Sequence, residues 1–242
     1  KGAAIATIIS QSLGLLYSYS HLFSGKALVK LRFKKLVFSN EIVRGILAIS
    51  IPTTASQGAL AIGIFFLNKI IASFGSLALA GMGVALRLES VAVLPAFAVG
   101  LATLSVIGQN IGARQYGRAR LASIFSSISA FIFMEAVGIA LLLASPVLLS
   151  MFTKDAAVIA YGRQYFGIVA LAYGFLGLRL IAASSFQGLG KAWQVLVITS
   201  FAFGLMIALA YALAFPLQLG IKGVWLGIMA AHLAAGIAAQ LW

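Results

Sequence analysis

The sequence contains no cysteine, and its 242 residues include only four acidic side chains and two histidines. Without cysteine, disulfides and thiolate metal ligands are excluded. His21 and His232 lie in different apolar segments, and neither has a carboxylate close in the sequence. A metal site or a catalytic triad therefore lacks the side chains that it would need. We expect no enzyme activity, no metal and no cofactor.

Charge of either sign is also scarce. Charged residues make up 9% of the chain and hydrophobic residues 62%, with a mean hydropathy of +1.10. A soluble domain usually has about a quarter charged residues. This chain carries more apolar surface than a soluble core can bury, so the composition predicts an integral membrane protein.

Apolar segments long enough to cross a bilayer recur along the whole chain. A span needs about 20 apolar residues as a helix, and about seven segments meet this requirement: 2–24, 45–72, 77–110, 119–150, 156–187, 192–215 and 220–242. The period-two alternation of a membrane β-barrel is missing. We therefore predict an all-α integral membrane protein with about seven transmembrane helices.

The net charge of +13 comes from basic residues in the connectors between these segments. Alternate connectors belong to opposite faces of the membrane. One face holds Lys26, Lys30, Arg32, Lys34, Lys35, Arg44, Arg114, Arg118, Arg120 and Lys191, and the other Lys1, Lys154 beside Asp155, and Lys222. The positive-inside rule makes the first face cytoplasmic. We interpret the charge as a topology signal of a multi-pass cell-membrane protein, plasma or inner, and not as a nucleic-acid surface.

The first and last segments begin alike. The chain starts Lys1-Gly-Ala-Ala-Ile without a methionine, and the last segment starts Gly220-Ile-Lys-Gly-Val. If both are the closing helix of a repeat, residues 1–24 are the last helix of an N-terminal lobe that is otherwise absent. Residues 25–44 are then a basic cytoplasmic connector, and residues 45–242 a six-helix C-terminal lobe. Repeat-built transporters place the substrate path between their halves.

Several motifs follow one another in the order and spacing of a known family. They are Ser50-Ile-Pro52, Arg87-Leu-Glu89 with Leu94-Pro95, Val106-Ile-Gly-Gln-Asn-Ile-Gly-Ala113 with Gly117-Arg-Ala119, Phe186-Gln-Gly-Leu-Gly-Lys191 and Gly220-Ile-Lys-Gly-Val-Trp225. Together they resemble the C-terminal half of multidrug and toxic compound extrusion (MATE) transporters, in particular the DinF-like branch. The resemblance implies the end of helix six plus helices seven to twelve, which is one lobe of a two-lobe, inverted or pseudo-symmetric transporter.

The resemblance also implies a function. MATE transporters export small organic, often cationic, compounds in exchange for protons or sodium by alternating access. The sodium-coupled branch has carboxylates at the positions of Leu60 and Leu176. Because both are missing here, the resemblance favours protons over sodium as the coupling ion. The main coupling carboxylate of the DinF-like branch belongs to a helix outside this chain.

Arg87 and Glu89 are two residues apart inside an apolar segment. A charge at the bilayer centre costs about 2.5–3.5 kcal/mol on insertion scales, so such residues usually face the bundle interior or a wet cavity. Positions two apart on a helix point in nearly opposite directions, so each needs its own partner. We regard Glu89 as a cavity-lining, coupling or structural residue. Arg87 is a cavity candidate for which a structural role is favoured.

Other polar residues within the spans are further candidates for the cavity. Thr53, Gln57 and Asn68 fall close to one helix face and suit a polar stripe toward the cavity, although interhelical hydrogen bonding is the favoured explanation. Arg179 and Glu135 lie inside two other spans. For these two we expect an ionic network within the lobe in preference to substrate contact.

Three functions remain open on the sequence. The first is one lobe of an ion-coupled multidrug exporter, whose partners are a small organic substrate, the lipid bilayer and the missing N-terminal lobe. The second is a lobe of a lipid-linked saccharide flippase, for which Arg87 and Arg179 would suit a pyrophosphate. The third is a half-length membrane protein that assembles with a partner and transports nothing itself. None of the three involves nucleic acid.

Overall fold

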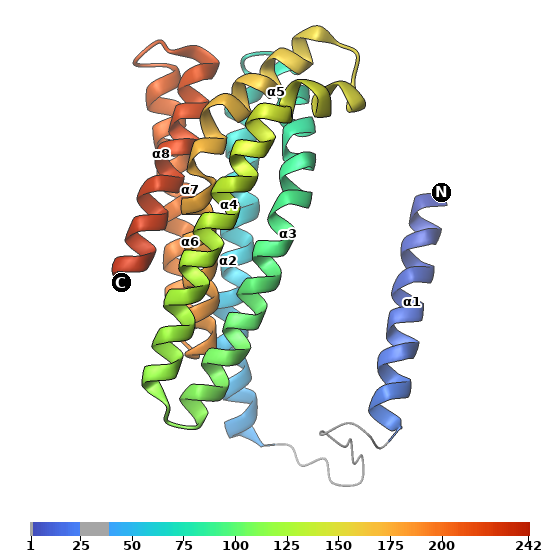
Figure 1. Cartoon of the computed structure of the whole chain (residues 1–242), viewed down its shortest axis with the longest axis vertical. Coiled ribbons are helices and arrows are strands. Elements are labelled where there is room, and N and C mark those ends of the chain that lie inside the picture. Colours follow the sequence, from blue (N-terminus) through green and yellow to red (C-terminus); the bar gives the residue numbers. More distant parts are fainter. Residues whose placement is uncertain (1, 25–38) are drawn as a thin grey trace. The chain divides into compact units, whose positions relative to one another are not determined.

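Helices make up almost all of the protein (Figure 1). The computed structural model describes residues 2–24 and 39–242, and no strand occurs in these ranges. The helices are α1 (Gly2–Phe23), α2 (Asn40–Ala72), α3 (Ser76–Gly112), α4 (Tyr116–Phe152), α5 (Ala156–Val169), the short 3-10 helix η2 (Ala170–Ala172), α6 (Tyr173–Gly188), α7 (Ala192–Ala214) and α8 (Gly220–Leu241). The predicted all-α fold is confirmed.

The chain divides into two compact units, Lys1–Arg44 and Gly45–Trp242. In the described ranges, six helical segments are long and apolar enough to cross a membrane, with α5, η2 and α6 counted as one. The helix expected at 2–24 forms as α1, but it is not among these six. The second unit is therefore a six-span lobe.

The outer surface of this lobe is apolar. Large hydrophobic side chains are exposed on several of its helices, among them Phe65, Val91, Leu101, Phe125 and Leu143. A soluble monomer rarely leaves so much contiguous apolar surface in water. The lobe therefore has the surface of a multi-pass membrane protein, with lipid as its natural solvent.

The connectors between the spans lie close to the gaps between the predicted apolar segments. The connector between the predicted segments 77–110 and 119–150 is shorter than expected, because α3 continues to Gly112 and α4 already begins at Tyr116. Asn110 stays helical by donating from Nδ2 to the carbonyl oxygen of Val106 at 2.8 Å. Arg114, with φ of 58°, then takes the left-handed conformation that reverses the chain.

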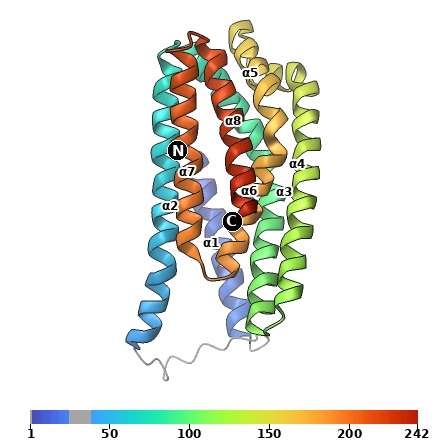
Figure 2. The ribbon, with the colours of Figure 1, turned by 90° about the vertical axis from the view of Figure 1, so that its left-hand side faces the viewer.

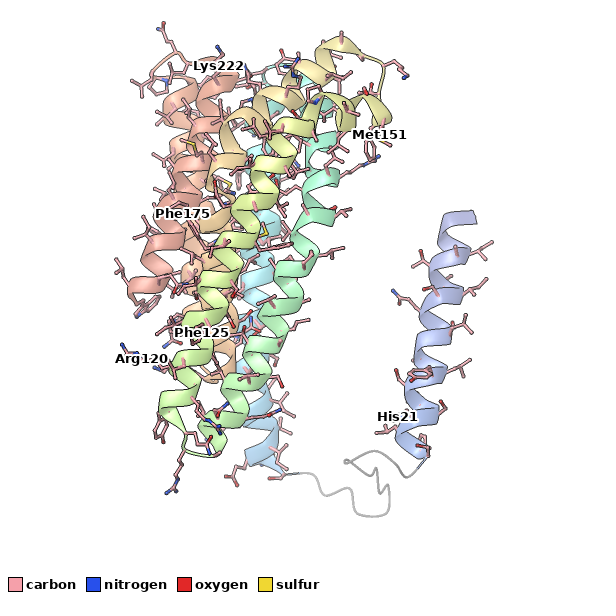
Figure 3. The ribbon with its side chains drawn as sticks, in the orientation of Figure 1. His21, Arg120, Phe125, Met151, Phe175 and Lys222 are labelled. Atoms are coloured by element: carbon pink, nitrogen blue, oxygen red, sulfur yellow. The ribbon has the colours of Figure 1, made fainter. Side chains whose placement is uncertain are left out.

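Apart from Arg87 and Arg179, which lie within spans, the basic residues of the lobe lie toward its two ends. Arg120 and Lys222 occupy opposite ends (Figure 3), as the alternation of connectors predicted. However, Lys69 in the last turn of α2 and Arg163 in α5 belong to the end that also carries Lys154 and Lys222. The charge asymmetry within the lobe is thus smaller than we expected from the connectors alone. The predicted cytoplasmic side depends largely on the basic residues before Gly45, of which Lys26 to Lys35 lie outside the described residues.

The segment predicted as one helix over 156–187 is interrupted. Asp155 starts α5 as its N-cap, with Oδ1 accepting from the backbone of Ala157 at 2.8 Å. The helix then tightens into η2 before α6 begins at Tyr173. Glu135 on α4 explains why the break is tolerated in lipid, since its Oε2 accepts a hydrogen bond from the backbone nitrogen of Gly174 at 2.8 Å. A side chain thus satisfies a backbone donor at the break.

The core forms where α3, α4, α5, α6 and α8 pack around this break. Its largest fully buried side chains include Trp225, Tyr165, Tyr173 and Phe166. Helices α7 and α8 run side by side in both ribbon views (Figures 1 and 2). The backbone of α2, in contrast, stands off from its neighbours within the lobe. This spacing leaves room for a cavity beside α2.

Candidate functional site

A cavity of about 570 Å³ lies between α2, α3, α6 and α7. Its volume is in the range of small-molecule binding sites. Apolar side chains form much of its wall, and eight polar or charged residues also line it: Thr53, Ser56, Gln57, Glu89, Ser90, Arg179, Gln187 and Thr199. A mostly apolar pocket with a few convergent polar groups suits an amphipathic organic molecule.

Glu89 is the acidic residue of this cavity. Its Oε2 accepts two hydrogen bonds, from the hydroxyl of Tyr165 at 2.5 Å and from that of Tyr173 at 2.8 Å. Its Oε1 makes no hydrogen bond with a described residue and is not buried. One carboxylate oxygen is therefore fixed by the protein, and the other is available on the cavity side.

The interrupted helix brings the two tyrosines together. Tyr165 precedes η2 and Tyr173 follows it, so the break sets the positions of both hydroxyl groups. Tyr165 also packs edge-on against the ring of Trp225, with the centroids 5.3 Å apart. Trp225 is held in turn by a hydrogen bond from its Nε1 to Oε1 of Gln164 at 3.1 Å. Side chains of α5, α6 and α8 thus position the carboxylate of α3.

Arg87 is directed away from the cavity, as the two-residue offset predicted. Its side chain is exposed, does not line the cavity and makes no side-chain hydrogen bond with the described residues. The structure therefore gives it neither a structural partner nor a place at the site. Its long aliphatic stem can carry the charge toward the membrane surface, which a glutamate cannot do as easily.

The polar stripe predicted on α2 is only partly brought together. Thr53 and Gln57 both line the cavity, whereas Asn68 does not. The hydroxyl of Thr53 donates to the carbonyl oxygen of Ile49 at 2.7 Å, while the Gln57 amide makes no hydrogen bond with a described residue. Asn68 is eleven residues from Gln57, about three turns along the helix, and lies beyond the end of the cavity.

The ionic network expected around Arg179 and Glu135 does not form among the described residues. Glu135 accepts from the backbone of Gly174 and does not line the cavity. Arg179 does line it, yet its Nε is buried without a hydrogen-bond partner. The expectation therefore fails because the two side chains leave α4 and α6 toward different surroundings.

Sequence reasoning missed several residues of the site. Tyr165 and Tyr173 were not among the candidates, nor were Ser90, Gln187 and Thr199. A signal for the tyrosines was present, because both lie mid-span, where a hydroxyl has no water and must find a partner. However, tyrosines of membrane proteins more often lie at the interface between membrane and water, so this signal was not used.

Leu60 and Leu176 both line the cavity. The positions at which the resemblance places sodium-branch carboxylates are thus part of this site, but here they carry alkyl side chains. Within the described residues, no three His, Cys, Asp or Glu side chains come together as a metal site would require. Glu89 is the acidic side chain that remains on the cavity wall.

Comparison with known proteins identifies the family of this chain. The family model MatE matches residues 52–212. The chain belongs to the MatE family. Relatives in this family include the probable multidrug resistance protein YpnP of Bacillus subtilis, 28% identical over 241 residues, which cover 100% of this chain and 54% of that protein. The FAD transporter of Shewanella oneidensis is 30% identical over 161 residues, which cover 66% of this chain and 35% of that protein.

Solved structures of MATE transporters have the same fold. A crystal structure of MATE in complex with MaL6 matches with a TM-score of 0.94 at 26% identity, over 100% of this chain and 55% of that one. A MOP superfamily transporter from Pyrococcus furiosus gives the same TM-score, identity and coverage. The MatE chain thus spans about half the length of the relatives that it matches, which corresponds to a single lobe.

Proposed function

We propose that this chain forms one lobe of a secondary active transporter that exports organic compounds, cationic ones included, in exchange for an ion by alternating access. The observation that carries the proposal is Glu89, a carboxylate on the wall of a membrane-embedded cavity with one oxygen held by two tyrosines. The similarity to multidrug resistance proteins supports the direction of transport and the class of substrate. The transport path then needs a second lobe in addition to residues 45–242.

The geometry of Glu89 suits exchange of a proton. Its Oε2 keeps two donors in either protonation state, because a neutral carboxyl oxygen can also accept. Its Oε1 can take a proton or receive the cationic group of a substrate, and these two events exclude one another. Substrate binding therefore releases the proton, and protonation releases the substrate. This competition is the minimum that antiport requires.

Protons suit the site better than sodium. A sodium ion needs several oxygen ligands and a compensating negative charge, whereas the cavity adds only neutral hydroxyl and amide oxygens to its single carboxylate and has Leu60 and Leu176 on its wall. A proton needs only one acceptor oxygen. We therefore infer proton coupling at this lobe.

Transport in proteoliposomes tests the proposal. The protein is expressed from its own gene, reconstituted, and given an inwardly or outwardly directed proton gradient with the cationic dye rhodamine 123 on one side. Concentrative dye movement opposite to the proton gradient is expected, with no such movement under a sodium gradient at constant pH. Dye movement that only equilibrates, whatever the gradient, would refute antiport.

A further inference from the structure

Arg179 has a charge that no described residue neutralises through a hydrogen bond or an ion pair. The residue lies on α6, lines the cavity, and its Nε is buried without a hydrogen-bond partner. No described residue accepts a hydrogen bond from its guanidinium group. Buried charges are normally paired, because leaving water without a partner is costly. The guanidinium group therefore needs a hydrogen-bond acceptor that the described residues do not supply.

The surroundings of Arg179 hold its position without supplying that acceptor. Its Cζ lies 6.0 Å from the centroid of the Phe203 ring. This ring in turn fills a space that exists because residue 63 is glycine, since a Cβ there would stand 2.7 Å from Cγ of Phe203. An aromatic face attracts a guanidinium cation but cannot accept its in-plane N–H groups.

The titratable groups around Arg179 leave it unpaired. Glu135 is engaged by the backbone of Gly174, and Glu89 lies in the same cavity without a bond to the arginine. His232 on α8 is also nearby, but no hydrogen bond joins it to Arg179, and its own Nδ1 is buried without a partner. None of these groups accepts a hydrogen bond from Arg179, and the cavity that it lines is open to an acceptor.

We propose that Arg179 binds an anionic group of the transported molecule, a carboxylate or a phosphate. A guanidinium group presents several donors in a plane and matches the two oxygens of such a group. Because Glu89 exposes its Oε1 to the same cavity, the lobe is suited to zwitterions, with the cationic group at Glu89 and the anionic group at Arg179. This proposal rests on the proposed function, in that it takes the cavity as the substrate site.

Two rhodamine dyes that differ by one methyl group provide the test. Rhodamine 110 has a free carboxylate, and rhodamine 123 is its methyl ester. Binding to the purified protein in phosphatidylcholine nanodiscs is followed by fluorescence polarisation. We expect the wild type to bind the acid about tenfold more tightly than the ester. Arg179→Met should remove this preference, and Arg179→Lys should keep part of it. Arg87→Met, which removes a cation outside the cavity, should leave the preference unchanged.

Equal affinity for the two dyes, no measurable binding of the acid, or a preference that survives Arg179→Met would each overturn the anion site. Adding phosphatidylglycerol to the nanodiscs identifies the source of the anion. If it weakens acid binding to the wild type but not to Arg179→Met, a lipid phosphate reaches the site, as a lipid-exporting lobe requires; if it has no effect, the site takes a soluble anion.

The transport assay separates this proposal from the proposed function. Export of the ester by Arg179→Met with loss of acid export supports the anion site. Acid and ester exported equally well by the wild type would overturn the anion site and leave antiport intact. A binding preference without gradient-driven export of either dye would refute antiport and leave the anion site standing.

Discussion

At the scale of single residues, Glu89 and Arg87 show how the same stretch of helix can serve two environments. Glu89 lies among tyrosines on the cavity wall, whereas Arg87 is exposed on the other side of α3. The difference follows from helix geometry, since two residues correspond to a rotation of about 200°. A carboxylate on a cavity wall, with two donors on one oxygen and none on the other, is poised to bind and release a proton.

We expect Glu89→Gln to impair coupled export more than stability. The amide oxygen can still accept from Tyr165 and Tyr173, so the free energy of unfolding should fall by no more than about 1 kcal/mol. The amide cannot release a proton in exchange for a substrate. Transport driven by a proton gradient and thermal unfolding are compared in wild type and variant. Normal proton-driven export by Glu89→Gln would rule out its coupling role, and a parallel loss of both would make it structural.

The two tyrosines should act together in holding Glu89. Tyr165→Phe or Tyr173→Phe removes one donor to the carboxylate, and each should lower the free energy of unfolding by about 1–2 kcal/mol. The double variant should cost more than the sum, because the carboxylate then loses its last donor. Tyr161→Phe is the control, since the Tyr161 hydroxyl makes no hydrogen bond with a described residue. If the loss of stability in the double variant equals the sum of the two single losses, the hydroxyls do not act on a common charge.

At the scale of elements, the interruption between α5 and α6 organises the site. It places Tyr165 and Tyr173 on either side of η2, and it leaves backbone groups that need partners away from water. Glu135 from α4 supplies one partner, so a charged residue that resembles a cavity candidate in the sequence is part of the scaffold.

Replacement of Glu135 should therefore affect folding before transport. Glu135→Gln retains an acceptor oxygen for the nitrogen of Gly174, whereas Glu135→Leu leaves that donor unsatisfied and should lower the free energy of unfolding by about 1–3 kcal/mol. Thermal unfolding of the two variants in the same detergent is the measurement. If Glu135→Gln is destabilised as much as Glu135→Leu, the negative charge of Glu135 stabilises the protein. The hydrogen bond to the backbone of Gly174 would then not explain why a glutamate is present in α4.

Gly138 on α4 allows close approach of the same break. A Cβ at this position would stand 3.2 Å from the Cβ of Tyr173 and nearer still to the carbonyl oxygen of Ala170. We expect Gly138→Ala to destabilise the protein by about 1–3 kcal/mol, because backbone has to shift. Gly83→Ala is the matched control on α3, with no atom within 4 Å of the added carbon. That variant should be neutral or stabilised by up to about 1 kcal/mol through its helix propensity. If Gly138→Ala and Gly83→Ala change the stability equally, the break between α5 and α6 tolerates separation from α4.

At the scale of the whole molecule, the fold predicts which connectors share a side of the membrane. Each of the six spans of the lobe reverses the direction of the chain. Ser76 and Thr153 therefore lie on one side, and Gln115 on the other. Because these 242 residues contain no cysteine, a single cysteine introduced at each position is the only thiol among them. An impermeant maleimide applied to intact cells should label one set and not the other. Labelling of Gln115 and Thr153 from the same side would contradict the six-span lobe.

The amino-acid sequence by itself determined that the protein is an all-helical membrane protein. It also determined where along the chain the spans lie and which family motifs are present. These features depend on local composition, since about 20 apolar residues span a bilayer wherever they occur and a glycine or polar cluster ends a helix. The helical offset of two positions was likewise enough to separate Glu89 from Arg87 onto different faces. Thr53, Gln57, Glu89 and Arg179 were identified as cavity candidates, and all four line the cavity.

Only the tertiary structure decided what these residues contact. The break at Ala170–Ala172 has no strong local signal, because it is stabilised by Glu135 from another helix, 39 positions away from Gly174. For the same reason Tyr165 and Tyr173 could not be assigned to Glu89, from which they are separated by 76 and 84 positions. Asn68, Glu135 and Arg87 were cavity candidates from polarity alone, and packing placed them elsewhere. A sequence reveals that a polar group lies in the membrane, but the partner that satisfies it is chosen by the packing of helices distant along the chain.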